Sequence, residues 1–228
     1  MQTERTAVHF PLTPDECELA LDHPAWEGNI RRCLDLLLAI TLCAIALPLL
    51  LLIGLLIRID SQGPVLYTRI RMGKNGRPFP MYKFRSMFVD ADERLHEFLL
   101  GDPELQNEYE QFHKLREDPR ITRVGKVLRR FSLDELPQLW NVIRGDMAIV
   151  GPRPYDPGER AKMQQAGRII LAVKPGLTGL WQISGRSHVS FYDRLKMDCR
   201  YVTERSVIED LRILACTLKA VLSGRGAY

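Results

Sequence analysis

One uncharged stretch decides the fold: residues 36–57 read LLLAITLCAIALPLLLLIGLLI. As a straight helix these 22 residues would be about 33 Å long, which is enough to cross the hydrocarbon core of a bilayer. A buried helix of a soluble domain is the other explanation, but a small domain seldom surrounds a helix that is apolar on every side. The stretch therefore predicts insertion into a membrane.

A proline divides this stretch into two arms, 36–47 and 48–57. Proline inside a helix removes one backbone hydrogen bond and clashes with the preceding turn, so Leu47-Pro48 predicts a kink or a break. Each arm would be about 15–18 Å long, roughly half of a bilayer core. Arginines flank both ends, whereas a spanning segment usually concentrates Lys and Arg on the cytoplasmic side. The residues alone are compatible with a re-entrant helix-break-helix and with a kinked single span.

The composition of the whole chain is that of a globular protein. Of 228 residues, 46% are hydrophobic and 26% charged, which excludes disordered and low-complexity classes. A net charge of +4 does not indicate a nucleic-acid-binding protein. The five cysteines form no CxxC pair, which is typical of a reducing compartment. We expect an N-terminal extension over residues 1–29, the membrane segment over 30–58, and a cytoplasmic domain over 59–228.

The domain is predicted to be α+β and mostly helical. Two short strands, 65–67 and 81–85, flank an Asn75-Gly76 pair, which is typical of a β-hairpin. Residues 174–179 read as a loop and 180–183 as a short strand. Helical spacing of apolar residues covers 90–114 with a break at 101–103, a basic amphipathic segment at 121–131, then 159–173, and 195–221 with a break near 205–206.

The segment that follows the membrane stretch is basic. From Arg58 to Met87 there are seven Lys and Arg residues and one acid, Asp60. Such a segment favours contact with anionic lipid headgroups. A substrate phosphate would be bound by the same charges, and the two interpretations are compatible.

A pair of adjacent acids precedes an apolar helix within residues 132–143. Ser132 and Glu135 have the spacing of a capping box, whereas with Asp134 as the cap, Pro137 falls in the first turn without loss of a hydrogen bond. Either arrangement puts both acids at a helix N-terminus, where the helix dipole favours the ionised carboxylate. The acids are either ordinary capping residues or a functional pair.

Basic residues accompany this pair. Arg129 precedes it, Arg153 follows between two prolines, and Lys83 and Arg85 lie in the second predicted strand. Arginine binds phosphate oxygens in bidentate fashion and stays charged. Two carboxylates together with several cations suit a diphosphate bridged by Mg²⁺, an ion that takes one or two carboxylates plus phosphate oxygens. A solvated basic face, or contact with lipid headgroups, is the alternative.

These motifs resemble the bacterial sugar transferase family, the monotopic phosphoglycosyl transferases. The resemblance extends over residues 30–228 and is closest to the undecaprenyl-phosphate galactose or glucose phosphotransferase branch. The motifs that carry it, in chain order, are KFRSM at 83–87, SLDELPQLWN at 132–141, GDM at 145–147 with GPRP at 151–154, KPGLTG at 174–179 and GR at 185–186.

The resemblance implies a fold, a mechanism and a cofactor. Residues 30–58 would form a re-entrant helix-break-helix whose two ends lie on the cytoplasmic face of the inner membrane. Asp134 would be a nucleophile that attacks the β-phosphate of a UDP-sugar, releases UMP and forms a phosphosugar-enzyme intermediate, which polyprenyl phosphate then attacks. Glu135 would be its partner, with Mg²⁺ as cofactor bound by this pair, and Arg129 and Arg153 would bind phosphate.

One residue departs from the family pattern, and the oligomeric state is open. The family usually has serine before the membrane proline, so Leu47 removes one hydrogen bond at the bend. The resemblance also allows a homodimer.

We therefore expect a membrane-embedded enzyme that transfers a sugar 1-phosphate from a UDP-sugar to undecaprenyl phosphate. This would be the first membrane step in the synthesis of exopolysaccharide, O-antigen, capsule or glycoconjugate. The alternative is a non-catalytic membrane-anchored adaptor, in which Asp134 and Glu135 only cap a helix. An aspartyl phosphatase, a third hypothesis, would release free phosphate rather than UMP.

Overall fold

The computed structural model describes residues 25–100, 105–106, 109, 118–184 and 189–223. Most of the predicted N-terminal extension and most of the predicted helical segment after residue 103 lie outside these ranges. The described part is mostly helical with two small sheets, so the predicted α+β class is confirmed.

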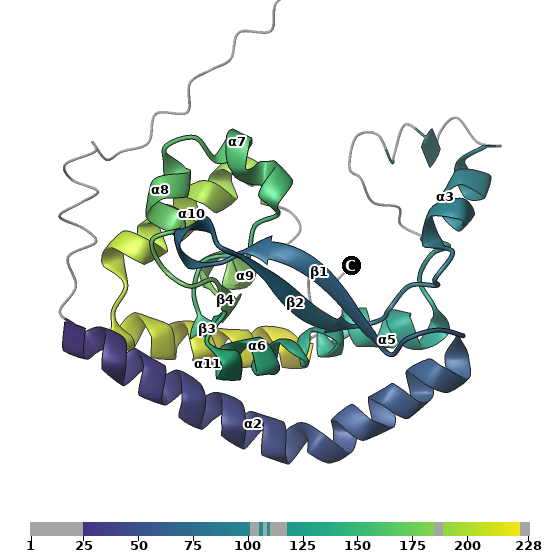
Figure 1. Ribbon diagram of the computed structural model, residues 1–228, viewed down its shortest axis with the longest axis horizontal. Helices are drawn as coiled ribbons and strands as arrows, with labels where there is room; N and C mark the ends of the chain where they lie inside the picture. Colours follow the sequence, from purple (N-terminus) through teal and green to yellow (C-terminus); the bar gives the residue numbers. More distant parts are fainter. Residues whose placement is uncertain (1–24, 101–104, 107–108, 110–117, 185–188, 224–228) are drawn as a thin grey trace, which may run out of the picture.

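The membrane stretch lies in one helix, α2 (Ala25–Asp60). This helix continues through Leu47 and Pro48, so the predicted break between two separate helices is wrong. Figure 1 shows α2 bent rather than interrupted. The physical reason is that proline removes a single hydrogen bond while the bonds of the neighbouring turns remain, which permits a bend without loss of the helix.

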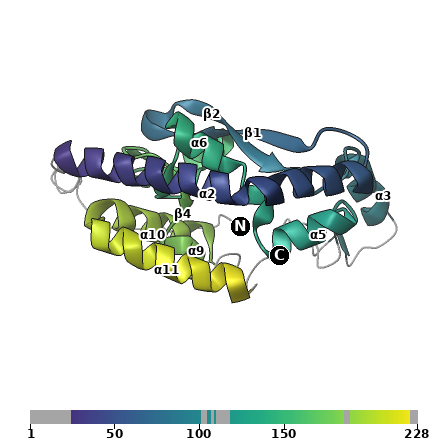
Figure 2. The same ribbon diagram turned by 90° about the horizontal axis from the view of Figure 1, so that it is seen from below.

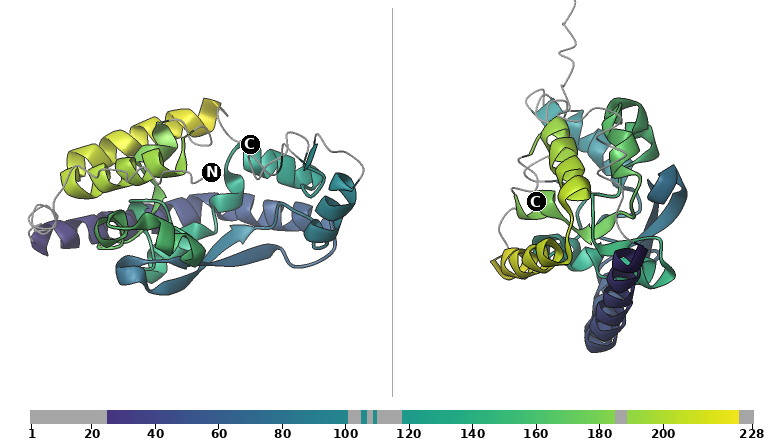
Figure 3. Two further views of the ribbon diagram at one scale, coloured as in Figure 1. Left: turned by 90° about the horizontal axis from the view of Figure 1, so that it is seen from above. Right: turned by 90° about the vertical axis from the view of Figure 1, so that its left-hand side faces the viewer.

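Most of α2 is exposed. Its apolar window is long enough to cross a membrane, and 11% of that window is buried inside the protein. Figure 2 shows α2 running along the whole domain, with the β1–β2 hairpin beside it on one side and α10 and α11 on the other. In the end-on view of Figure 3, α2 projects from the body of the domain. An apolar helix exposed in this way needs an apolar surrounding, which supports association with a membrane.

The predicted hairpin is confirmed. Strands β1 (Leu66–Met72) and β2 (Pro78–Phe84) pair antiparallel, in register from Leu66 opposite Phe84 to Met72 opposite Pro78. The short helix η1 (Lys74–Gly76) joins them, with Asn75 at φ 59° and Gly76 at φ 72°. These two residue types adopt the left-handed conformation at low cost, which is why the Asn-Gly pair was informative.

The second sheet departs from the prediction. Strand β3 (Ala148–Val150) pairs in parallel with β4 (Gly176–Thr178), although residues 174–179 were predicted to be a loop. The backbones of Gly151 and Gly176 approach so closely that a Cβ on either would overlap the other. Glycine permits this close approach of two backbones, but it is also typical of loops, so the sequence did not indicate a strand here. The predicted strand at 180–183 is instead the helix α9 (Leu180–Ile183), because a short apolar run does not distinguish the two.

The remaining helices follow the predicted pattern with one exception. The expected helix over 159–173 is divided at Gln164, where φ is 49° and ψ −130°. The expected break near 205–206 is confirmed. The remaining elements are α3 (Ala91–Leu99), α5 (Arg123–Arg130), η2 (Leu133–Glu135), α6 (Gln138–Arg144), η3 (Pro157–Glu159), α7 (Arg160–Met163), α8 (Ala166–Ile170), α10 (Phe191–Glu204) and α11 (Val207–Ser223).

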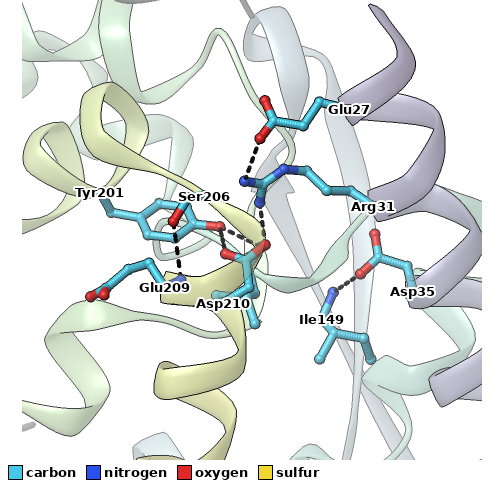
Figure 4. Close-up of polar contacts among 9 residues, drawn as sticks. Glu27, Arg31, Asp35, Ile149, Tyr201, Ser206, Glu209 and Asp210 are labelled. Atoms are coloured by element: carbon cyan, nitrogen blue, oxygen red, sulfur yellow. Dashed lines mark hydrogen bonds and ion pairs between the residues drawn. The ribbon is translucent and has the colours of Figure 1, made fainter. Parts of the chain in front are cut away.

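Both ends of α2 are attached to the same domain. Near its start, Arg31 forms an ion pair with Asp210 of α11, and the Tyr201 hydroxyl donates to the same carboxylate at 2.7 Å (Figure 4). At its end, the Asp60 carboxylate accepts a hydrogen bond from the Val124 amide of α5 at 3.0 Å. Between these attachments the helix contributes only a narrow buried face.

The C-terminal part of α2 is also a packing platform. Ile53 and Ile57 are buried against Phe84 of β2 and Leu128 of α5. Leu133 and Leu136, on either side of the acidic pair, pack against the same cluster. Three segments that carry predicted site residues therefore rest on one end of the apolar helix.

Replacing Arg31 with Gln should weaken the attachment of α2. Asp210 is largely buried, and burial raises the pKa of its carboxyl to about 6 even with Arg31 beside it. Removing the cation leaves this buried carboxylate with the Tyr201 hydrogen bond and the charge of Arg205, but without its ion pair, which should lower the free energy of unfolding by roughly 1–3 kcal/mol. Thermal unfolding in nanodiscs measures the effect. Arg200→Gln, which breaks an exposed ion pair with Glu204, is the matched control and should change stability little. Equal losses of stability in Arg31→Gln and Arg200→Gln would contradict a role of Arg31 in attaching α2.

Candidate active site

The two acids lie in η2, a single helical turn that leads into α6. Ser132 is at φ 55° and its side chain caps nothing, so the predicted capping box is wrong. Leu136 and Pro137 continue in helical conformation, and α6 begins at Gln138 with Pro137 at its N-cap. Proline fits there because the first amides of a helix lack intrahelical partners. Gly145, at φ 89°, ends the helix.

A lysine from β2 joins the acids. The Lys83 ammonium lies 2.6 Å from Oε1 of Glu135 and 4.0 Å from Oδ2 of Asp134. Asn141 of α6, which is fully buried, fixes this arrangement. Its side-chain amide donates to the Pro80 carbonyl at 2.7 Å, and its oxygen accepts from the Tyr82 amide at 3.1 Å. The hairpin is thereby tied to the helix that follows the acids.

Arg129, at the end of α5, supplies a second positive charge. Its Nε donates to the Ser86 hydroxyl at 2.9 Å, and its charge acts on Asp134. Burial lowers the pKa of the Arg129 guanidinium, and the charge of Asp134 partly offsets this. The structure thus brings together four of the predicted site residues: Lys83, Arg129, Asp134 and Glu135.

Arg85 and Arg153 lie elsewhere. The Arg85 guanidinium donates to the Ser61 carbonyl and hydroxyl and to the Gln62 carbonyl, so it holds the loop that follows α2. Lys83 and Arg85 would share a face in a continuing strand, but β2 ends at Phe84. No hydrogen bond or ion pair in the described part of the chain joins Arg153 to Asp134. Phosphate binding by these two arginines stays a prediction.

Burial controls the ionisation of Asp134. The residue is 9% exposed, and desolvation raises the pKa of its carboxyl to about 6; Glu135 raises it further, whereas Lys83 and Arg129 lower it. A helix N-terminus favours the ionised form, as expected, but one short turn lowers the pKa by less than burial raises it, so the net shift of the pKa is upward. Near pH 7 about nine in ten molecules still carry the ionised carboxylate. Asp134 is therefore a desolvated anion beside two cations.

The sequence analysis missed a buried carboxylate, Asp198 of α10. It is fully buried, and its Oδ2 accepts from the Tyr155 hydroxyl at 2.8 Å and from the Arg153 amide at 3.1 Å. Burial raises the pKa of the Asp198 carboxyl to about 7. A signal was present, because Asp198 interrupts the apolar face that Leu195 and Val202 define at helical spacing.

The acids fit a magnesium ion shared with a substrate. No group of three or more potential metal-ligating side chains occurs among the described residues. The described residues therefore do not form a metal site from protein ligands alone. Mg²⁺ commonly uses one or two carboxylates and completes its shell with phosphate oxygens and water. Asp134 and Glu135 are two such carboxylates. Glu135 would then bind both the ion and the Lys83 ammonium.

Comparison with known proteins identifies the family to which the chain belongs. The model of the family described as bacterial sugar transferase matches residues 26–224. The exopolysaccharide production protein ExoY of Sinorhizobium fredii is 44% identical over 88% of this chain and 89% of its own length. The undecaprenyl-phosphate galactose phosphotransferase of Salmonella typhimurium is 43% identical over 87% of this chain and 42% of its own length. The undecaprenyl-phosphate glucose phosphotransferase of Komagataeibacter xylinus is 38% identical over 89% and 38%, respectively.

Replacing Asp134 with Asn should stabilise the fold. The pKa of the folded-state carboxyl is raised from 3.8 to about 6, so the charged form is disfavoured by folding. The cost is small near pH 4, grows as the pH rises, and is complete above about pH 6, where it reaches about 3 kcal/mol. The neutral amide of the variant removes this cost. Thermal unfolding should show a higher midpoint for Asp134→Asn at pH 7.5 and nearly equal midpoints at pH 4; a lower midpoint at pH 7.5 would disprove the account.

Proposed function

Because the chain belongs to the bacterial sugar transferase family, we propose that it transfers a sugar 1-phosphate from a UDP-sugar to undecaprenyl phosphate and releases UMP. The names of its relatives support the lipid acceptor, and those of the exopolysaccharide production proteins support a role in exopolysaccharide synthesis. The observation that carries the proposal is a buried carboxylate, Asp134, placed beside Lys83 and Arg129.

In the first step, a carboxylate oxygen of Asp134 attacks the β-phosphorus of the UDP-sugar. The bond from that phosphorus to the bridging oxygen breaks, and UMP leaves with the electron pair. The product is an acyl phosphate in which the sugar phosphate is bound to Asp134. Such covalent catalysis divides one difficult transfer into two easier displacements. Lys83 and Arg129 offset the negative charge of the phosphoryl oxygens during attack.

In the second step, a phosphate oxygen of undecaprenyl phosphate attacks the same phosphorus. The bond from phosphorus to Asp134 breaks, the carboxylate is restored, and undecaprenyl-diphosphate sugar is released. The raised pKa of Asp134 makes the carboxylate a stronger nucleophile than an exposed aspartate while leaving it mostly ionised at pH 7.

Asp134 and Glu135 are the residues that would hold Mg²⁺. When bound, the ion would neutralise charge on the diphosphate. Glu135 also holds Lys83 at 2.6 Å, which keeps the ammonium within reach of the nucleophile.

The adaptor hypothesis assigns the acids a capping role only. Within the described structure the side chains of neither acid cap α6, whose N-cap is Pro137. An adaptor also gives no reason for a desolvated carboxylate between two cations. An aspartyl phosphatase would use the same carboxylate but would transfer the phosphate to water.

We also propose a re-entrant placement of α2 in the cytoplasmic face of the inner membrane. The attachments at Arg31 and Asp60 hold both ends of the helix against one domain. A straight span would carry one end to the far side of the bilayer and break one of these attachments. The bend shown in Figure 1 allows the apolar middle of α2 to enter the membrane while both ends stay with the domain.

Asp134→Asn should abolish UMP release from a UDP-sugar while the protein stays folded. The amide keeps the shape of the side chain and removes the nucleophile. Asp92→Asn, which alters an exposed aspartate of α3, is the control and should retain full activity. Undiminished UMP release by Asp134→Asn would refute the mechanism, and free phosphate in place of UMP would indicate a phosphatase.

The pH dependence of kcat/KM should report Asp134. Activity should fall as the pH drops through about 6, because protonation removes the nucleophile. Lys83→Met removes a cation that lowers this pKa, so the acid limb should move to higher pH as well as losing rate. An unshifted limb in Lys83→Met would mean that another group controls the profile.

The topology is tested by labelling of single cysteines. Asn29→Cys and Gln62→Cys, both at exposed positions, are placed in turn in a background without the native cysteines. An impermeant thiol reagent should label neither in intact cells and both after permeabilisation. Labelling of only one of the two in intact cells would show a true span.

A further inference from the structure

Ser86 links the β1–β2 hairpin to α5. It lies two residues beyond the end of β2 and is 8% exposed. Its carbonyl accepts a hydrogen bond from the Thr122 amide at 3.1 Å, and its hydroxyl accepts one from Nε of Arg129 at 2.9 Å. Thr122 is the N-cap of α5, and Arg129 lies in its last turn. Ser86 is therefore bound through its backbone by the start of this short helix and through its side chain by the end.

Three residues of α5 meet Ser86 along one face of the helix. Thr122, Gly125 and Arg129 are spaced by three and four residues, which puts them on the same side. The Thr122 hydroxyl accepts from the Gly125 amide at 2.9 Å and so fixes the first turn. A Cβ on Gly125 would overlap the Ser86 carbonyl oxygen, so the helix backbone lies directly against Ser86. The Arg129 side chain thus returns to a residue on which its own helix already rests.

The hydrogen bond from Nε fixes the orientation of the Arg129 guanidinium. This group is planar, and its N–H donors have fixed directions relative to one another. Once Nε is bound to Ser86, the terminal NH2 groups can take only the directions that this bond allows. No hydrogen bond or ion pair from these terminal groups occurs among the described residues. Their donors therefore remain available, and the charge of the guanidinium acts on Asp134.

A second carboxylate attracts Arg129. Asp118 is 9% exposed, and its charge acts on the same guanidinium as the charge of Asp134 does. Arg120 binds the two oxygens of Asp118 at 2.8 and 2.7 Å, yet two carboxylates still act on one cation. Loss of the Ser86 hydroxyl would leave the Nε–H of a largely buried guanidinium without an acceptor, which is costly. The guanidinium would then be free to turn toward Asp118.

On the basis of the proposed function, we propose that Ser86 is a positioning residue for the transfer reaction. Its hydroxyl holds the Arg129 guanidinium in the orientation that offsets the charge of the phosphoryl oxygens during attack by Asp134. Ser86 acts through Arg129, since its hydroxyl makes no hydrogen bond to either acid of the site in the described structure.

The value of this hydrogen bond lies in placing the charge before the reaction begins. A cation that is already oriented needs no rearrangement while charge develops on the substrate. A misplacement of about 1 Å can reduce the rate of an enzyme about 100-fold. Lys83 and Ser86, three residues apart, would therefore place both cations of the site: Lys83 carries its own charge to the acids, and Ser86 orients that of Arg129.

The test is a double-mutant cycle on kcat/KM for UMP release. Ser86→Ala should lower kcat/KM by about tenfold or more, as expected for loss of one hydrogen bond to a charged group. Arg129→Gln should lower it at least as much, because the cation itself is removed. In the Arg129→Gln background, Ser86→Ala should cost less than about twofold, because no guanidinium remains to be positioned.

Three further variants keep the test decisive. Ser86→Thr retains the hydroxyl and should keep most of the wild-type kcat/KM. Ser86→Cys has nearly the same shape but a weaker acceptor, so it should lose activity as Ser86→Ala does, and it decides the matter if Ser86→Ala does not fold. Ser61→Ala is the matched control, because the Ser61 hydroxyl accepts from Arg85 at 2.8 Å while Arg85 keeps two carbonyl acceptors. This variant should leave kcat/KM near the wild-type value.

The outcomes separate this inference from the proposed function. If the wild-type protein releases UMP and Ser86→Ala retains its kcat/KM, the positioning role is wrong. Equal losses from Ser86→Ala with and without Arg129 would show that Ser86 acts only through the stability of the fold, and would also overturn the inference. Failure of the wild-type protein to release UMP would instead refute the proposed function.

Discussion

The packing of the end of α2 against β2 and α5 is the constraint on which the site depends. Ile53 and Ile57 are buried with Phe84 and Leu128, and each partner is next to a site cation: Phe84 follows Lys83, and Leu128 precedes Arg129. The residues flanking the acids pack on the same cluster. The apolar helix therefore does more than anchor the chain, because it holds together the three segments that supply the charges.

This arrangement also explains the electrostatics. Leu133 and Leu136, on either side of the acids, pack against an apolar helix end. Asp134 is buried between them, and burial raises the pKa of its carboxyl to about 6. Lys83 and Arg129 lower this pKa and so favour the ionised carboxylate. Asn141 ensures that the lysine stays in register with the acids, because its amide bonds the edge of β2 to α6. A site at this end of α2 would lie close to the membrane surface, where a soluble nucleotide and a lipid-borne phosphate both have access.

Local signals in the sequence predicted much of the fold, whereas contacts between distant segments were not visible in it. The hairpin followed from Asn75-Gly76, because these residues form the turn by themselves. Strand β4 was missed because its pairing depends on Gly151, which is distant in sequence. Lys83, Arg129, Asp134 and Glu135 were predicted as site residues and lie together. The partners of Arg85 and the burial that raises the Asp134 pKa arise from packing, which composition and spacing do not reveal.

The central claim is that Asp134 carries the sugar phosphate between the two substrates. The most direct measurement is intact-protein mass spectrometry after mixing the enzyme with a UDP-sugar that it accepts, in the absence of undecaprenyl phosphate. The account predicts a mass increase of one sugar phosphate, located on the peptide that contains Asp134, absent from Asp134→Asn and lost when undecaprenyl phosphate is added. Product formation by wild-type enzyme without any such adduct, in rapid-quench samples taken within one turnover, would contradict it.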